Sequence, residues 1–178
     1  MHKKWKDQSG FTLVEMLIVV IVLGILAMIV VPQVAVSTED TKLKTLQTNL
    51  SALRNAAELY YAQHNQTYPG AKDNAGAANP TALASATAFV EQLTQYTDIN
   101  GAVQTTKDNT YKYGPYIKGG ALPTNPFDID SDVLCDILTA DITTKAADGT
   151  TSWKFYVKTG ILLPNDNGTT DGTVHASL

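Results

Sequence analysis

Residues 10–31 read GFTLVEMLIVVIVLGILAMIVV, and Glu15 is the only charged residue between Phe11 and Val31. An apolar run of this length is long enough to cross a bilayer as one helix. Three lysines precede the run within the first ten residues, and the next lysine or arginine is Lys42. Because lysine and arginine favour the cytoplasmic side, we expect a cytoplasmic N-terminus and an exported remainder of the chain.

Two simpler interpretations of this segment fit less well. A secretory signal peptide has an apolar core of about 7–15 residues and ends at a small-x-small cleavage site, whereas this run is longer and ends in VVPQ at residues 30–33. A plain membrane anchor fits the length but leaves Glu15 unexplained, since a charge near the bilayer centre costs on the order of 3 kcal/mol. Glu15 therefore indicates a function beyond anchoring.

The leader ending at Gly10, followed by FTLVE at residues 11–15 and an apolar helix containing Pro32, resembles the signal of type IV pilins and of type II secretion pseudopilins. The resemblance implies that a prepilin peptidase cleaves between Gly10 and Phe11 and methylates the new amino group of Phe11. It also implies that Glu15 and Pro32 belong to the segment that assembles into a filament.

Elementary electrostatics assigns Glu15 a role in that assembly. An unpaired carboxylate in hydrocarbon is costly, and cleavage would create a positive amine on Phe11. Pairing Glu15 with the Phe11 amine of a neighbouring subunit would neutralise both groups, and only a correctly staggered neighbour supplies that amine. We therefore expect loss of Glu15 to impair assembly more than folding.

The helix is expected to continue beyond the apolar run, to about His64. An apolar stripe with alternating steps of three and four residues indicates one buried helical face. The members of this stripe are Leu43, Leu46, Leu50, Leu53, Ala57 and Tyr60. Because proline removes a backbone hydrogen bond and crowds the preceding turn, Pro32 predicts a kink or a locally melted segment near residues 26–32.

The pattern changes after the long helix. Asn79 and Pro80 are typical of a helix start, and predict a second helix. Residues 153–157 (WKFYV) are typical of a strand and have turn signals on both sides. Two short hairpins packed on the second half of the long helix would make a small antiparallel sheet. We therefore predict an α+β, pilin-like fold, in which the first half of the long helix is transmembrane and the second half packs on this sheet.

These elements divide the chain into four predicted parts. They are a leader peptide at 1–10, a transmembrane or filament-core helix at 11–31, its amphipathic continuation at 32–64, and an exported α+β domain at 65–178.

The cysteine content and the charge of the chain limit which class of protein it can belong to. Cys135 is the only cysteine, so no internal disulfide can form, and we expect a buried structural thiol. Many type IV pilins carry a C-terminal disulfide loop, so its absence favours the major pseudopilins, which residues 114–117, 122–127 and 153–160 also resemble. From Phe11 onward the chain has 10 basic and 16 acidic residues, which argues against specific nucleic-acid binding.

Two acidic segments are candidate metal sites. Asp128, Asp130 and Asp132 lack the glycine and glutamate of an EF-hand loop, and a solvated acidic strand edge explains them better. The DNGTTDG segment at residues 166–172 is the better calcium candidate, because oxygen side chains separated by glycines can wrap a hard cation. Major pseudopilins resemble this chain in having a calcium-binding C-terminal loop. The candidate ligands are Asp166, Asn167 and Asp171, and the alternative is a plain flexible turn without any cofactor.

The sequence contains no recognisable catalytic set, so we expect no enzyme activity. We expect a structural filament subunit that begins as a single-pass inner-membrane protein with its globular domain in the periplasm or outside the cell. The preferred interpretation is the major pseudopilin of a type II secretion system, in a periplasmic pseudopilus. One alternative is the major pilin of a type IV surface pilus used for adhesion, motility or DNA uptake. Another alternative, of a different class, is a membrane-anchored periplasmic binding domain that never polymerises.

The resemblance also implies the partners of such a subunit. They are further copies of this chain, the prepilin peptidase, the membrane itself, an inner-membrane assembly platform, and minor pilins or pseudopilins.

Overall fold

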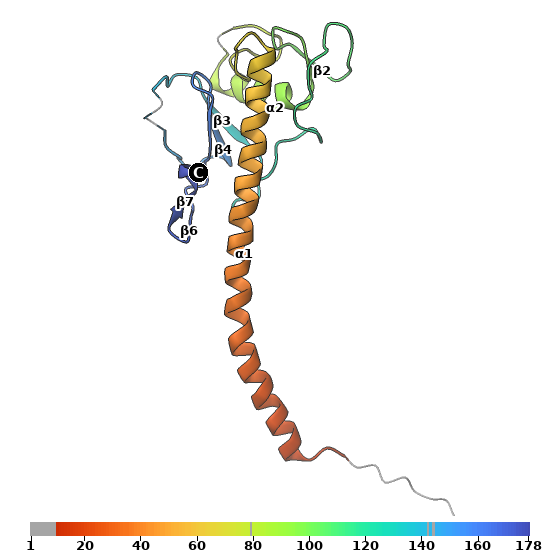
Figure 1. Ribbon diagram of the computed structural model, residues 1–178, viewed down its shortest axis with the longest axis vertical. Coiled ribbons are helices and arrows are strands. Elements are labelled where there is room, and N and C mark those ends of the chain that lie inside the picture. The colour runs from red at the N-terminus through yellow and green to blue at the C-terminus, as the bar shows by residue number, and fades with distance from the viewer. Residues whose placement is uncertain (1–9, 79, 142, 144) are drawn as a thin grey trace, which may run out of the picture. The chain divides into compact units, whose positions relative to one another are not determined.

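A computed structural model describes the chain except residues 1–9, 79, 142 and 144, and describes residues 29–37 by their backbone alone. The chain divides into two compact units, Met1–Asp40 and Thr41–Leu178. Figure 1 shows the order of the elements. The elements are α1 (Leu13–Gln63), α2 (Ala82–Thr94), β1 (Tyr96–Thr97), β2 (Val103–Gln104), β3 (Val133–Asp136), β4 (Trp153–Tyr156), β5 (Ile161–Pro164), β6 (Thr169–Thr170), β7 (Thr173–Val174) and the 3-10 helix η1 (His175–Ser177).

The long helix predicted from the sequence is present as α1. Its backbone is helical without interruption through Pro32, which excludes the locally melted alternative for this state. The side chain of Pro32 lies outside the described residues, and the kink stays a prediction. After Gln63 the chain turns at Asn65 and Gln66, whose φ angles of 54° and 57° lie in the left-handed region and end the helix.

Among the residues whose side chains are described, no helix is both long enough and apolar enough to cross a membrane. The predicted span at 11–31 includes residues 29–31, whose side chains lie outside that set.

The second half of α1 forms one wall of the core. Leu46, Leu50 and Leu53 are almost fully buried, as the apolar stripe predicted, and they belong to one cluster with Trp153 and Phe155 of β4. This part of α1 lies beside β3 and β4 (Figure 1). Full burial of each leucine contributes about 1.5–3 kcal/mol, so this face fixes the helix on the domain.

Arg54 adds a polar connection between α1 and the sheet. Its guanidinium donates two hydrogen bonds to the Leu162 carbonyl, at 3.2 and 2.8 Å, and one to the Leu178 carbonyl, at 3.1 Å. The fork geometry of a guanidinium suits such paired contacts. Arg54 thereby joins the helix to β5 and to the last residue of the chain.

The main sheet has three strands in the order β3-β4-β5. β4 and β5 are antiparallel, with Phe155 opposite Leu162, whereas β3 runs parallel to β4, with Cys135 opposite Phe155. The prediction of antiparallel hairpins is therefore correct for β4–β5 and wrong for β3–β4. The reason is the connection at 137–152, which is long enough to return the chain for a parallel pairing. The α+β class is confirmed.

The second helix begins slightly later than the sequence predicted. Thr81 caps α2, because its hydroxyl oxygen accepts a hydrogen bond from the Ala84 amide at 3.2 Å. Asn79, the predicted cap, lies outside the described residues. Phe89 and Leu93 of α2 are fully buried and complete the core over the sheet.

His64 is buried just beyond the end of α1. Its ring stacks on Tyr60, with centroids 3.7 Å apart, and its two nitrogens lie 2.9 Å from the Tyr60 carbonyl and 2.9 Å from the Thr97 hydroxyl. Burial lowers the pKa of His64 below its usual value, so the ring is neutral at pH 7.

This burial predicts a pH-dependent stability. Below pH 6.5, the ordinary histidine value, the unfolded chain takes up a proton at His64 that the folded chain does not. The free energy of unfolding should therefore fall as the pH drops, by up to about 1.4 kcal/mol per pH unit. Urea denaturation between pH 5 and pH 7 measures this slope, and His64→Asn should flatten it. Equal slopes in the two proteins would contradict the assignment.

Candidate functional site

The predicted cleavage point lies in exposed, non-helical backbone. Gly10, Phe11 and Thr12 precede α1, and the Phe11 side chain is exposed. A methyl group added at Gly10 would meet nothing within 4 Å. Such an open segment is accessible to a peptidase, and cleavage between Gly10 and Phe11 stays a prediction.

Glu15 and Thr12 form a capping box at the start of α1. The Thr12 hydroxyl oxygen accepts a hydrogen bond from the Glu15 amide at 3.2 Å, and Glu15 Oε2 accepts from both the amide and the hydroxyl of Thr12, each at 2.7 Å. This reciprocal arrangement satisfies two amides that have no partner within the helix. In the isolated chain Glu15 is therefore held by its own first turn, a contact that the sequence analysis missed although its T-x-x-E signal is local.

The first half of α1 presents apolar side chains to its surroundings on all sides. The residues that share this exposure, which ranges from 46 to 83%, are Leu13, Val14, Met16, Leu17, Ile18, Val19, Val20, Ile21, Val22, Leu23, Ile25, Leu26 and Met28. An exposed apolar surface of this extent marks a contact with lipid or with other protein.

The three predicted calcium ligands in the C-terminal loop differ in their surroundings. The Asp166 side chain is 5% exposed and Oδ1 lies 2.9 Å from His175 Nδ1. Asn167 and Asp171 are exposed and adopt positive φ angles of 54° and 49°, typical of turn residues. Within the described part of the chain, no three histidine, cysteine, aspartate or glutamate side chains form a group that could hold a metal ion.

The arrangement around Asp166 does not fit a calcium site. Oδ1 also accepts a hydrogen bond from the Gly168 amide at 2.8 Å, and Oδ2 accepts one from the Asn125 side chain at 2.7 Å. Calcium needs six to eight oxygen ligands, and both oxygens of this carboxylate already face donors. The pairing of His175 with Asp166 has no local sequence signal, because the two residues lie nine positions apart.

The three other aspartates form a turn, not a strand edge. Asp128 Oδ1 accepts hydrogen bonds from the Asp130 amide at 3.1 Å and from the Ser152 hydroxyl at 2.9 Å. Asp132 Oδ1 accepts from the Ser152 amide at 2.7 Å. The expected acidic strand edge was wrong, because these carboxylates satisfy backbone and side-chain donors around the start of β4.

Cys135 is a structural thiol, as predicted. It is buried in β3, and burial raises its pKa to about 12. At neutral pH Cys135 is therefore a protonated thiol within the core.

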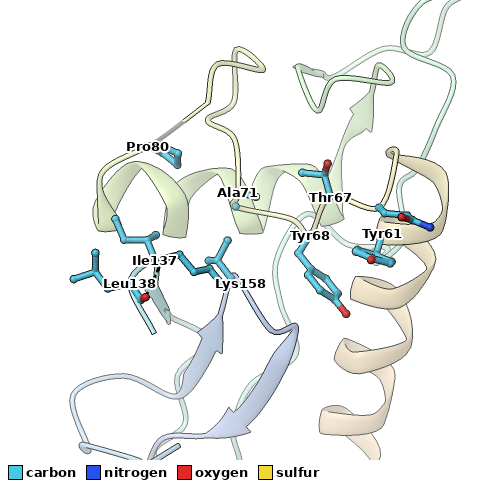
Figure 2. A pocket seen from close by; sticks show the side chains of 11 residues that line it. Tyr61, Thr67, Tyr68, Ala71, Pro80, Ile137, Leu138 and Lys158 are labelled. Carbon is cyan, nitrogen blue, oxygen red and sulfur yellow. Dashed lines mark hydrogen bonds between the residues drawn. The ribbon is translucent and has the colours of Figure 1, made fainter. Parts of the chain in front are cut away.

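Figure 2 shows a cleft between the end of α1 and the far end of the sheet. Its volume is about 630 Å³, and Tyr61 and Tyr68 stack in its wall with ring centroids 4.3 Å apart. Across from them lie Ile137, Leu138 and Lys158, and Lys158 Nζ donates a hydrogen bond to the Leu138 carbonyl at 3.0 Å. Among the described residues, the lining of this cleft contains no acidic side chain, histidine or cysteine.

Comparisons with known proteins place this geometry in context. Residues 5–31 match the family model of the prokaryotic N-terminal methylation motif. Type II secretion system core protein G of Vibrio cholerae is 33% identical over 149 residues, which is 83% of this chain and 86% of that protein. The protein of the same name from Aeromonas hydrophila is 29% identical over 122 residues, covering 68% of this chain and 69% of its own length. A fimbrial protein of Pseudomonas aeruginosa is 47% identical over 53 residues, only 30% of this chain and 34% of that protein. No solved structure matches the chain.

Proposed function

This chain belongs to the family of type II secretion system core protein G, the major pseudopilins, and from that premise we propose that it is the main building block of a secretion filament. The likeness to a core protein G extends over 83% of the chain. The likeness to a fimbrial protein covers 30%, so the longer match favours secretion over a surface pilus.

The observation that carries the proposal is the contrast between the two halves of α1. The second half is buried against its own domain, while apolar side chains from Leu13 to Met28 are exposed. In the membrane these side chains would face lipid, and in a filament they would face the same segment of neighbouring subunits. A surface that is apolar on every side suits both environments, and so suits a subunit that moves from one to the other.

The proposal includes an order of events. The chain enters the inner membrane with its N-terminus in the cytoplasm, and the prepilin peptidase cleaves after Gly10 and methylates Phe11. Polymerisation on the assembly platform then brings the Phe11 amine of one subunit to Glu15 of the next. Each Glu15 would exchange its contact with Thr12 for a charge partner in another chain. Minor pseudopilins are further expected partners, and no catalysis is expected.

Processing is the first step to test, by intact mass and N-terminal sequencing of protein recovered from cell envelopes. The expected product begins at Phe11 and carries one added methyl group. Gly10→Val is the matched variant, because an added side chain at Gly10 would meet nothing within 4 Å and we expect the fold to tolerate it. We expect the variant to remain uncut from Met1. An uncut unsubstituted chain in cells with an active prepilin peptidase would overturn the proposal.

The cleft at Tyr61 and Tyr68 favours a second candidate, a membrane-anchored binding domain that does not polymerise. The two functions differ in what happens after processing. A filament subunit crosslinks into a ladder of multimers in the envelope, whereas an anchored domain stays monomeric. Recovery of the subunit in sheared surface fibres would instead favour a pilus.

A further inference from the structure

We propose that a buried pair between His175 and Asp166, and not a bound calcium ion, holds the C-terminal hairpin β6–β7 of this chain in place. The side chains of the two residues are 1% and 5% exposed, and His175 Nδ1 lies 2.9 Å from Asp166 Oδ1. The proposal concerns the folding of the domain, so it stands or falls independently of filament formation.

The first argument is that both oxygens of the Asp166 carboxylate already accept hydrogen bonds from the protein. Oδ1 accepts hydrogen bonds from His175 Nδ1 and from the Gly168 amide, and Oδ2 accepts one from the side-chain amide of Asn125 at 2.7 Å. All three donors present hydrogen atoms to the carboxylate. A cation bound there would have to displace positively polarised hydrogens from both oxygens.

The second argument is that the orientation of His175 does not depend on its charge. Asp166 can only accept when it is a carboxylate, so Nδ1 carries the proton in the neutral ring as well as in the charged one. The Nε2 atom lies 3.0 Å from the Thr170 hydroxyl, which can donate or accept as required. Whether the His175 ring is neutral or charged, its Nδ1–H group points at Asp166 Oδ1, the oxygen that a calcium ion would need.

The third argument is that the space around the imidazole is filled. Phe127 lies against the ring, with centroids 4.1 Å apart. A methyl group added at Gly168 would come within 2.5 Å of Nδ1, so the hairpin backbone rests directly on the imidazole. The His175 amide also donates to the Gly168 carbonyl at 3.0 Å.

The pair thereby connects three segments that are distant in sequence. His175 and Asp166 belong to the C-terminal hairpin and its flanks, Asn125 belongs to the loop before β3, and Asn125 Nδ2 continues to the Ser152 carbonyl beside β4 at 3.3 Å. A calcium ion in such a loop would connect segments in the same way. Here side chains of the protein itself provide that connection.

The test is thermal denaturation of the full chain in detergent micelles, with millimolar calcium chloride or with EGTA. We expect the same Tm, within about 1 °C, in both conditions. His175→Phe keeps a ring in the space but removes one of the three donors to the buried Asp166 carboxylate, and should lower Tm by roughly 10 °C in both conditions. His175→Asn, which can still donate toward Asp166, should lose less.

Asp171→Asn provides the matched control, because asparagine tolerates the positive φ at this position. It removes a carboxylate that a calcium site would use, and we expect the Tm of this variant to be the same in calcium chloride and in EGTA. A Tm that calcium raises and EGTA lowers by several degrees, with the difference abolished in Asp171→Asn, would overturn the proposal. An unchanged Tm in His175→Phe would overturn it equally. Should His175→Phe fail to fold, the calcium response of the unsubstituted chain still decides the question.

Discussion

Glu15→Ala is expected to reduce crosslinkable multimers by at least about tenfold, while the folded domain keeps its Tm. Within the described part of the chain the Glu15 carboxylate accepts hydrogen bonds from Thr12 of its own first turn, and Glu15 lies in the unit Met1–Asp40, outside the core cluster that contains Trp153. Its loss should therefore not disturb the domain. In assembly the loss would leave the Phe11 amine of each neighbour without a partner, and a tenfold change corresponds to about 1.4 kcal/mol.

A matched substitution separates the charge of Glu15 from its role as a cap. Glu15→Gln keeps an oxygen acceptor for the Thr12 amide and preserves the capping box, but it removes the negative charge. If pairing with the Phe11 amine sets the register, this variant should assemble as poorly as Glu15→Ala. Normal assembly of Glu15→Gln would show that the cap alone is sufficient. Normal assembly of Glu15→Ala would leave the non-polymerising binding domain as the better interpretation.

Trp153→Ala is expected to destabilise the globular unit by about 3–5 kcal/mol, the usual range for removing a large buried aromatic side chain. Trp153 is fully buried at the start of β4, and its indole nitrogen donates to the Pro123 carbonyl at 2.9 Å. The substitution would create a cavity and also leave that carbonyl without its donor. A domain with an ordinary free energy of unfolding, about 5–15 kcal/mol, would lose a large share of it. Urea denaturation would measure this loss.

Two controls make this result interpretable. Trp153→Phe keeps most of the apolar volume and loses the hydrogen bond to Pro123, so it should cost distinctly less than Trp153→Ala. Leu138→Ala removes an exposed side chain, and the free energy of unfolding should stay within about 0.5 kcal/mol. A loss in Trp153→Ala no larger than in Leu138→Ala would contradict the position of Trp153 at the centre of the core.

Features with a local cause could be predicted from the sequence. The buried positions of α1, among them Leu46, Leu50 and Leu53, follow from helical periodicity. The strand β4 follows from its three aromatic residues, and the burial of Cys135 follows from the general preference of a lone cysteine for the protein interior. The capping box between Thr12 and Glu15 is equally local, and its spacing was sufficient to identify it.

Features that depend on distant segments could not be predicted. The parallel pairing of β3 with β4 depends on the path of residues 137–152, which carry no strong periodicity. The pairing of His175 with Asp166 depends on the fold of the hairpin, and Asn125, which also bonds Asp166, belongs to another loop. A sequence pattern of oxygen side chains and glycines is compatible with a calcium loop and with this internally bonded loop alike.

The continuity of α1 has a mechanical consequence. The helix runs unbroken from Leu13 to Gln63, so tension applied at its first turns travels along its hydrogen-bonded backbone into the domain. The leucines that fix it there, Leu46, Leu50 and Leu53, follow one another along the helix axis. An axial pull therefore strains these contacts in shear, all at the same moment, whereas a sideways pull would break them one after another. The second half of α1 therefore resists a pull along its own axis more strongly than a pull across it.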